Sequence, residues 1–132
     1  MRQINLFQQI CKISTKHFFS YNNSLVFGVP RSQVSKAIGK DASNVKRLSQ
    51  ILRKKIKIIA MPSLDDNSGI IKFIEDLVSP VEISKIQITE DKMEINTNRI
   101  NRASLIGRNR TREKELIKIL KDAFSIRELR IA

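Results

Sequence analysis

The stretch that decides the fold reads Ala37-Ile38-Gly39-Lys40-Asp41-Ala42-Ser43-Asn44-Val45-Lys46-Arg47-Leu48. Apolar residues at helical spacing stand on both sides of the glycine: Val34, Ala37 and Ile38 before it, and Val45, Leu48, Ile51 and Leu52 after it. Because glycine readily ends a helix, this pattern predicts two helices joined by a short turn. Such a turn places free backbone amides at the start of the second helix, where they can meet an anion.

The same pattern returns 68 residues further on, around Gly107. Six aligned pairs are identical: Arg31/Arg99, Ile38/Ile106, Gly39/Gly107, Leu48/Leu116, Ile51/Ile119 and Leu52/Leu120. Two more pairs keep a positive charge: Lys40/Arg108 and Lys46/Lys114. The matches fall on one apolar helix face and one basic turn, so we interpret the chain as two copies of one structural unit.

The surrounding elements predict the same order, α-β-β-α-α-β, in both copies. The first copy is expected to contain a helix over 2–11, strands over 12–19 and 24–29 around an Asn22-Asn23 turn, the two helices, and a strand over 55–60. The second is expected to contain a helix after a loop over 62–69, strands over 81–88 and 92–97, a short helix around Ile100, Ala103 and Ile106, a longer helix, and a strand over 126–131. We therefore predict an α+β chain of two domains, residues 1–62 and 63–132, packed as one body.

Composition narrows the function. The 132 residues include 25 Lys and Arg against 13 Asp and Glu, a net charge of +12, with Cys11 and His17 as the sole Cys and His. One cysteine and one histidine exclude a disulfide framework within the chain and any Cys-rich or His-rich metal centre. No apolar run is long enough to span a membrane. The charge favours an acidic partner, nucleic acid before an anionic membrane, and we expect a cytoplasmic protein. The first forty residues contain no acid, which leaves an organelle transit peptide as the alternative.

The positive charge is concentrated in two blocks. Residues 31–57 carry nine Lys and Arg against Asp41 alone, and residues 99–121 carry eight against Glu113 and Glu115. The stretch 65–94 holds eight acids and three bases instead. Both basic blocks cover the helix–turn–helix of their copy, and this recurrence favours a nucleic-acid surface over ordinary solvated helix faces.

Residues 37–48 resemble the signature of KH domains, Ile-Gly-Lys-x-Gly-x-Asn-Val-x-x-Leu, and the predicted element order resembles the type II, prokaryotic-type KH fold. Two such units in tandem, with the segment 73–81 between them, resemble the archaeal NusA-like transcription factors. This resemblance implies a pair of KH domains that binds single-stranded RNA and acts with RNA polymerase in elongation, pausing or termination.

The chain departs from the KH pattern at one position in each copy. A KH loop is Gly-x-x-Gly, which clamps a backbone of about four nucleotides. The second glycine is Ala42 in the first copy and Arg110 in the second. A methyl group is a mild obstruction, whereas a long side chain must turn away or grip phosphate itself. We therefore expect the first copy to bind RNA better, while the second either holds phosphate by charge or supports the architecture.

The candidate RNA-binding residues lie in and around the two turns. Lys40 and Arg108 are expected to contact phosphate, and Ile38 and Ile106 to form the floor on which bases rest. The full set is Arg31, Lys36, Ile38, Gly39, Lys40, Asp41, Ala42, Lys46 and Arg47 in the first copy, with Arg99, Arg102, Ile106, Gly107, Arg108, Asn109, Arg110, Arg112 and Lys114 in the second.

Other chemistry finds little support. No phosphate-binding Gly-x-x-x-x-Gly-Lys-Ser/Thr pattern occurs, and Cys11 and His17 lie on different predicted elements. The acids Glu90, Asp91 and Glu94 are interpreted as a hairpin tip rather than a cation site, and Phe18, Phe19 and Tyr21 as core rather than base-stacking residues. We expect no enzyme activity, cofactor or metal. Two other functions stay open: a ribosome-associated or RNA-processing KH protein that binds structured RNA, and a polymerase-docking protein with weakened RNA contacts.

Overall fold

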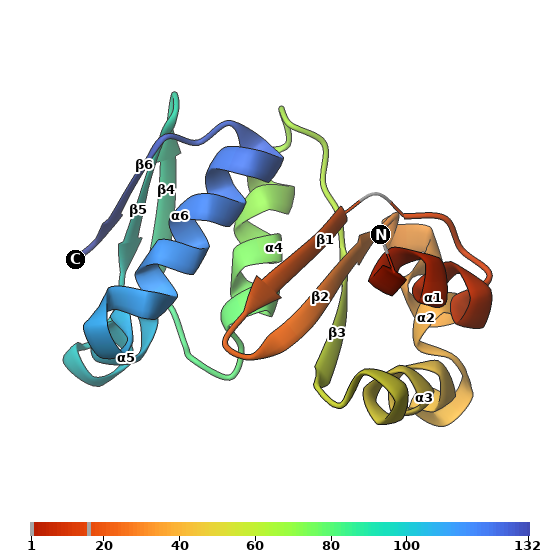
Figure 1. Cartoon of the computed structure of the whole chain (residues 1–132). Coiled ribbons are helices and arrows are strands. Elements are labelled where there is room, and N and C mark those ends of the chain that lie inside the picture. Colours follow the sequence, from red (N-terminus) through yellow and green to blue (C-terminus); the bar gives the residue numbers. More distant parts are fainter. Residues whose placement is uncertain (1, 16) are drawn as a thin grey trace. The chain divides into compact units, whose positions relative to one another are not determined.

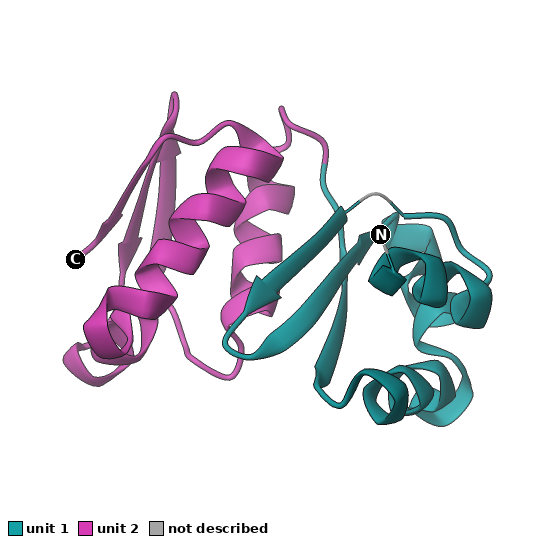
Figure 2. Ribbon diagram, in the orientation of Figure 1, with its two compact units in different colours: residues 1–62 teal, residues 63–132 magenta. Residues whose placement is uncertain are grey.

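The computed structural model describes residues 2–15 and 17–132, which form two compact units, Met1–Pro62 (unit 1) and Ser63–Ala132 (unit 2) (Figure 2). Within this described part, the chain contains six α-helices and two three-stranded sheets. The fold is therefore α+β, and each unit is described by itself below.

Unit 1 places three helices on one side of a three-stranded sheet (Figure 1). The order is α1 (Arg2–Cys11), β1 (His17–Tyr21), β2 (Ser24–Val29), a 3-10 turn (Arg31–Gln33), α2 (Val34–Ile38), a 3-10 turn (Lys40–Ala42), α3 (Ser43–Leu52) and β3 (Lys55–Ala60). The strand order is β1-β2-β3; β1 runs antiparallel to β2, and β3 runs parallel to it. Because β2 and β3 are parallel, α2, the turn and α3 form the crossover that joins them.

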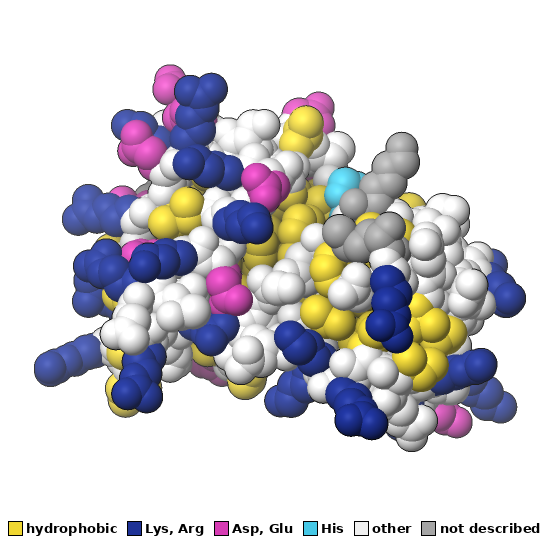
Figure 3. Space-filling model, in the orientation of Figure 1, with side chains coloured by type: hydrophobic (Ala, Val, Ile, Leu, Met, Phe, Trp, Pro, Cys, Tyr) yellow, Lys and Arg dark blue, Asp and Glu magenta, His cyan; other side chains and the backbone are white. Residues whose placement is uncertain are grey.

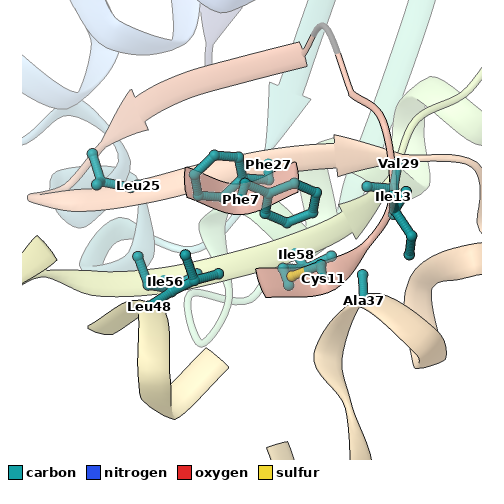
Figure 4. Packing of buried hydrophobic residues seen from close by; sticks show 10 residues of the cluster. All are labelled: Phe7, Cys11, Ile13, Leu25, Phe27, Val29, Ala37, Leu48, Ile56 and Ile58. Carbon is teal, nitrogen blue, oxygen red and sulfur yellow. The ribbon is translucent and has the colours of Figure 1, made fainter. Parts of the chain in front are cut away.

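The core of unit 1 is built from alternate strand residues and the inner faces of the helices. Figure 4 shows the rings of Phe7 and Phe27 side by side, with centroids 4.5 Å apart. Ala37 from α2 and Leu48 from α3 are both fully buried in this cluster. The other members are Cys11, Ile13, Leu25, Val29, Ile56 and Ile58. The packing therefore holds both helices that flank the turn against the sheet.

Unit 2 repeats this plan with a longer final helix. Its order is α4 (Asn67–Val78), β4 (Lys85–Thr89), β5 (Lys92–Asn96), α5 (Arg99–Ile106), a 3-10 turn (Arg108–Arg110), α6 (Thr111–Phe124) and β6 (Glu128–Ile131). The strand order is β4-β5-β6, again antiparallel and then parallel. Phe73 of α4 meets Phe124 of α6 edge to face, at 5.1 Å between ring centroids. The predicted α-β-β-α-α-β order is thus present in both units.

Several predicted element bounds are wrong. The strand expected over 126–131 is β6, which starts at Glu128. The strand expected over 12–19 is β1, which starts at His17, because the Thr15 hydroxyl donates to the Gly28 carbonyl at 2.5 Å in place of a strand ladder. Lys16 of that range lies outside the described residues. The strand expected over 81–88 is β4, which starts at Lys85. The loop expected to reach residue 69 ends earlier, because the Asp66 carboxylate accepts the Gly69 amide at 2.9 Å and caps α4.

The short helix predicted around Ile100, Ala103 and Ile106 is α5, but these apolar residues do not form its buried face. Ile100 is 80% exposed, and Ala103 is exposed as well. Leu105 is the fully buried residue of this helix. Its aligned partner in unit 1 is Ala37, which is equally buried, so the repeat alignment identifies the core position that periodicity in α5 alone misses.

Candidate nucleic-acid interface

Turn 1 (residues 39–42) and turn 2 (residues 107–110) have the same backbone conformation. Gly39 lies at φ 82°, ψ 168°, and Gly107 at φ 74°, ψ 171°. The third residue of each turn is left-handed, with φ 55° at Asp41 and 57° at Asn109. The fourth position is left-handed too, in both turns. The repeat seen in the sequence is therefore a repeat of an uncommon backbone path.

The glycines at the start of both turns are required by this path. Their dihedral angles fall in a region that only glycine occupies readily. Neighbouring atoms also leave no room for a side chain at either glycine. A Cβ on Gly39 would lie 2.7 Å from the Ser43 hydroxyl oxygen, and one on Gly107 would lie 2.5 Å from Cγ of Arg112. Backbone geometry therefore explains both glycines, whether or not the turn binds a ligand.

The missing second glycines leave the path unchanged. Ala42 adopts φ 59°, ψ 30°, and Arg110 adopts φ 60°, ψ 23°. A side chain in this left-handed region costs about 1–2 kcal/mol relative to the right-handed helix, which a packed protein tolerates. Replacing the second glycine therefore adds a side chain to each turn but does not change its backbone conformation.

Asn44 fixes the geometry of turn 1. Its Nδ2 donates to the Ala37 carbonyl at 3.1 Å and to the Lys36 carbonyl at 3.4 Å. These bonds tie the first turn of α3 to the carbonyl end of α2, so the two helix ends are held together across the turn. The aligned residue in unit 2 is Arg112, whose Nη1 instead donates to the Glu115 carboxylate.

A groove of about 490 Å³ runs beside α3 in unit 1. Its walls combine apolar, amide, hydroxyl and ammonium groups: Ser24, Val45, Lys46, Ser49, Gln50, Lys55, Ile56 and Lys57. Val45 and Lys46 belong to the first turn of α3, so the groove begins next to turn 1. Turn 1 and this groove, which we call the α3 groove, form the candidate interface.

The start of α6 in unit 2 carries two acids, Glu113 and Glu115, whereas the aligned start of α3 in unit 1 carries none. The residue aligned with Val45 is Glu113, and its carboxylate accepts Nη1 of Arg110 at 3.1 Å. Glu115 pairs with Arg112 on the next turn of the same helix. Among the described residues, no ion pair involves Lys40 or Lys46 of unit 1. Two of the arginines predicted to bind RNA in unit 2 are thus held by carboxylates, while the lysines of unit 1 are not.

The hollow found in unit 2 lies elsewhere and has a mixed charge. It measures about 350 Å³ and is lined by strand residues alone: Gln87, Thr89, Lys92, Met93, Glu94, Glu128, Leu129 and Arg130. No residue of turn 2 or of α6 contributes to it. Its position and charge therefore give no counterpart to the α3 groove.

Nearly all of the net charge belongs to unit 1. Residues 1–62 contain twelve Lys and Arg and a single acid, Asp41, whereas residues 63–132 contain thirteen Lys and Arg and twelve acids. Figure 3 shows the same contrast on one face: acidic side chains lie among the basic ones on unit 2 and are almost absent from unit 1. The attraction for a polyanion is therefore concentrated in unit 1.

The predicted site residues separate into groups. In unit 1, turn 1 and Lys46 lie at the interface, and Ile38 packs against the core cluster beside it. Lys36 and Arg31 are exposed on or just before α2. Arg47 is exposed but does not line the groove, because it follows Lys46 by about 100° around α3.

The predicted residues of unit 2 form a less open set. Arg99, Arg108, Asn109 and Lys114 are exposed, and Ile106 is half-buried. Arg102, however, donates from Nε to the Ile131 carbonyl at 3.2 Å, which ties α5 to β6. This bond gives Arg102 a structural role that its charge did not indicate.

Sequence reasoning missed most of the groove walls. Ser49 and Gln50 lie one turn beyond Lys46 on the same side of α3, a spacing that the helix period would have given. Ser24 comes from β2 and Ile56 from β3, and they line the groove together because these two strands pair. No local sequence pattern marks them.

The remaining candidates behave as core and surface groups. Cys11 is buried, and desolvation raises the pKa of its thiol to about 11, so the nucleophilic thiolate is disfavoured. Within residues 2–15 and 17–132, no group of three or more His, Cys, Asp or Glu is placed to hold a metal ion. No helix in this part of the chain is long and apolar enough to cross a membrane.

Comparison with known proteins supplies a fold but no function. No protein-family model matches the chain, and no curated protein matches it. Among solved structures, the crystal structure of APE1850 is similar, with a TM-score of 0.67 and 20% sequence identity. The match covers 99% of this chain and 96% of APE1850. The chain therefore shares its fold with a solved protein over nearly its whole length.

Proposed function

We propose that the two units are type II KH domains and that unit 1 binds single-stranded RNA on turn 1 and the α3 groove. One observation carries this proposal. No described carboxylate pairs with Lys40 of turn 1 or with Lys46 of the groove wall, and the groove beside α3 has both apolar and hydrogen-bonding walls. Sugar-phosphate backbone and unstacked bases need these two surfaces side by side.

The phosphate backbone is assigned to turn 1. The first amides of the ten-residue helix α3 point towards turn 1, where they can meet a phosphate. Lys40 is exposed within the turn and adds a charge at the same place. Asp41, the one acid of unit 1, is also exposed there and disfavours a second phosphate beside its carboxylate.

The bases are assigned to the α3 groove. Val45 and Ile56 offer apolar contact, while Ser49 and Gln50 offer donors and acceptors to base edges. Duplex RNA stacks and pairs its bases, so they are not free to enter such a groove. We therefore expect single strands to bind in preference to duplexes of equal length.

Unit 2 is assigned a weaker contact with RNA. Arg110 and Arg112 are already paired with Glu113 and Glu115, so phosphate must displace a carboxylate to reach them. Arg108 and Asn109 stay exposed in turn 2. This arrangement favours a supporting or protein-docking role for unit 2.

At the level of the cell, we propose a NusA-like factor that acts with RNA polymerase in elongation, pausing or termination. The support is the resemblance of the tandem signatures to that family. A KH protein of the ribosome or of RNA processing is the alternative. Co-purification with RNA polymerase subunits supports the first assignment, and co-purification with ribosomal RNA contradicts it in favour of the second.

A matched pair of charge reversals tests RNA binding. The variant Lys40→Glu/Lys46→Glu changes turn 1 and the groove, and Arg108→Glu/Lys114→Glu changes the aligned positions of unit 2. Fluorescence anisotropy with a labelled single-stranded RNA of about ten nucleotides measures affinity at two salt concentrations. We expect the first variant to lose at least about 30-fold in affinity and the second no more than about three-fold.

All four residues are exposed and lie outside the left-handed positions, so both variants should fold, which thermal unfolding checks. Equal losses in the two variants would show that total charge, rather than turn 1, binds RNA. Equal competition by an RNA duplex would contradict the single-strand assignment.

A further inference from the structure

We propose that Arg53, Lys54 and Lys55 form a second phosphate-binding site at the far end of the α3 groove. An RNA strand held at turn 1 would then continue along the groove and end on this site. We call these three residues the distal cluster. The inference rests on the proposed function and extends the RNA footprint beyond the nucleotides that turn 1 and the groove can hold.

The backbone of the distal cluster is fixed. Arg53 ends α3 in a left-handed conformation, φ 56°, and its amide donates to the Ser49 carbonyl at 2.8 Å. The Ser49 hydroxyl donates to the Lys54 carbonyl at 2.9 Å. Lys55 is the first residue of β3 and pairs in register with Ser24 of β2. The three cations therefore leave a rigid connection rather than a loose loop, which lowers the entropy lost when a ligand binds.

The charge of the distal cluster is unbalanced. All three side chains are exposed. In the part of the chain that the structure describes, none of the three takes part in an ion pair. The one acid of unit 1, Asp41, lies at the opposite end of α3. Three adjacent like charges repel one another, and a bound phosphate relieves that repulsion.

The distal cluster is continuous with the groove. Lys55 belongs to both, since it also lines the groove wall next to Ile56 and Lys57. The ten residues of α3 separate the cluster from turn 1 by about 15 Å along the helix axis. A turn of this kind clamps about four nucleotides, so the nucleotides that follow leave the groove at the cluster.

Unit 2 lacks an equivalent. The residue that ends α6 is Ser125 in place of Arg53, and β6 starts with Glu128 in place of Lys55. Arg127 lies 4.0 Å from the Asp91 carboxylate, and Glu128 pairs with Lys92 at 3.6 Å. The same place in the fold is therefore neutralised in unit 2, which makes the exposed triplet a property of unit 1 rather than of the fold.

Two RNA lengths and two variants test the distal cluster. The probes are single-stranded oligouridylates of about four and about ten nucleotides, the shorter one sized to turn 1 and the groove. The test variant is Arg53→Gln/Lys54→Gln, which removes two charges of the distal cluster and leaves Lys55 in the groove wall. The control variant, Lys118→Gln/Lys121→Gln, removes two exposed positive charges from unit 2. Affinities are measured by fluorescence anisotropy over a series of salt concentrations.

We expect the parent to bind the longer RNA at least about ten-fold more tightly than the shorter one. The test variant should keep its affinity for the shorter RNA within about two-fold and lose this length advantage. Its salt dependence for the longer RNA should fall by about 0.7 in log–log slope for each phosphate that is no longer neutralised. The control variant should keep both the advantage and the slope.

Two results would overturn the distal cluster alone: an unchanged length advantage in the test variant, or an equal loss in the control variant. A test variant that weakens both RNAs equally would also overturn it, because the cluster would then act through general charge. If the parent binds neither RNA, the proposed function fails, and the distal cluster fails with it.

Discussion

Turn 1 and turn 2 are nearly identical in backbone and differ in whether the cations in and beside them are paired with acids. Both begin with a glycine at ψ near 170° and continue through two left-handed residues. Lys40 and Lys46 of unit 1 stand without acid partners among the described residues, whereas Arg110 and Arg112 of unit 2 are paired with glutamates. The comparison teaches that packing preserves the turn, and that the acids around it decide whether its cations are available to a ligand.

The largest effect should come from breaking the shared conformation. Gly39→Ala and Gly107→Ala each place a Cβ in a glycine-only region and against the following helix. We expect each to lower the free energy of unfolding of its own unit by about 2–3 kcal/mol. Chemical denaturation followed by circular dichroism measures this, with Gly69→Ala within α4 as the control. A neutral Gly39→Ala would show that the two turns do not share a strained start.

High pH should lower the stability of unit 1 more than that of unit 2, because the single cysteine of the chain lies in the core of unit 1. Cys11 lies in the core of unit 1, and burial raises the pKa of its thiol from 9.0 to about 11. A raised folded-state pKa gives stability that is fully present below about pH 9 and is lost as pH rises towards 11. The loss should amount to on the order of 2 kcal/mol in unit 1 alone.

Denaturation of the parent and of Cys11→Ala at pH 8 and pH 11 measures this loss. The alanine variant should lack the pH-dependent part, although the smaller side chain lowers its stability at every pH. An equal loss between pH 8 and pH 11 in both proteins would assign the effect to other groups.

Removing the acids of unit 2 should make turn 2 more like turn 1. Glu113→Gln/Glu115→Gln frees Arg110 and Arg112 while keeping the size of both side chains. In the Lys40→Glu/Lys46→Glu background, where turn 1 is disabled, we expect RNA affinity to rise about three- to ten-fold. Anisotropy titration measures the change, and Asp122→Asn, which removes an acid from the far end of α6, is the control. No gain would mean that turn 2 does not face RNA.

The smallest effect should follow from restoring the missing glycines. Ala42→Gly and Arg110→Gly remove a side chain from a left-handed position, but glycine also loses more backbone entropy on folding. The net gain in the free energy of unfolding should be below about 1 kcal/mol for each variant. For Ala42→Gly we also expect unchanged RNA affinity within about two-fold. A large gain in affinity would show that the Ala42 methyl group obstructs the strand.

The sequence predicted most helices and strands because their apolar patterns are regular. The helix over 2–11 and the strand over 55–60 have the expected bounds. The strand expected over 12–19 began too early, because the Thr15–Gly28 hydrogen bond joins residues that no periodicity links. In the same way, Ile100 fitted the helical period and is nonetheless exposed, since α5 turns Leu105 inward.

The candidate site was only partly predictable for a different reason. Turn 1 and turn 2 carry local signals, a glycine between two helices, and both lie where the sequence placed them. The α3 groove depends on β2 and β3 being neighbours, so Ser24 and Ile56 enter it only through tertiary structure. Arg110 and Glu113 have the i, i+3 spacing of helical ion pairs, but spacing alone does not show that the carboxylate holds the arginine away from a ligand.

The parallel pairing of β2 with β3 has one more consequence. It places turn 1 inside a crossover whose two ends are anchored in the same sheet, while the bonds from Asn44 to the Lys36 and Ala37 carbonyls hold the two helix ends together across the turn. Its shape is therefore set during folding, before any ligand arrives. A ligand that fits would associate as with a rigid body, and a backbone break within the turn should leave two fragments still held together by the sheet and its core.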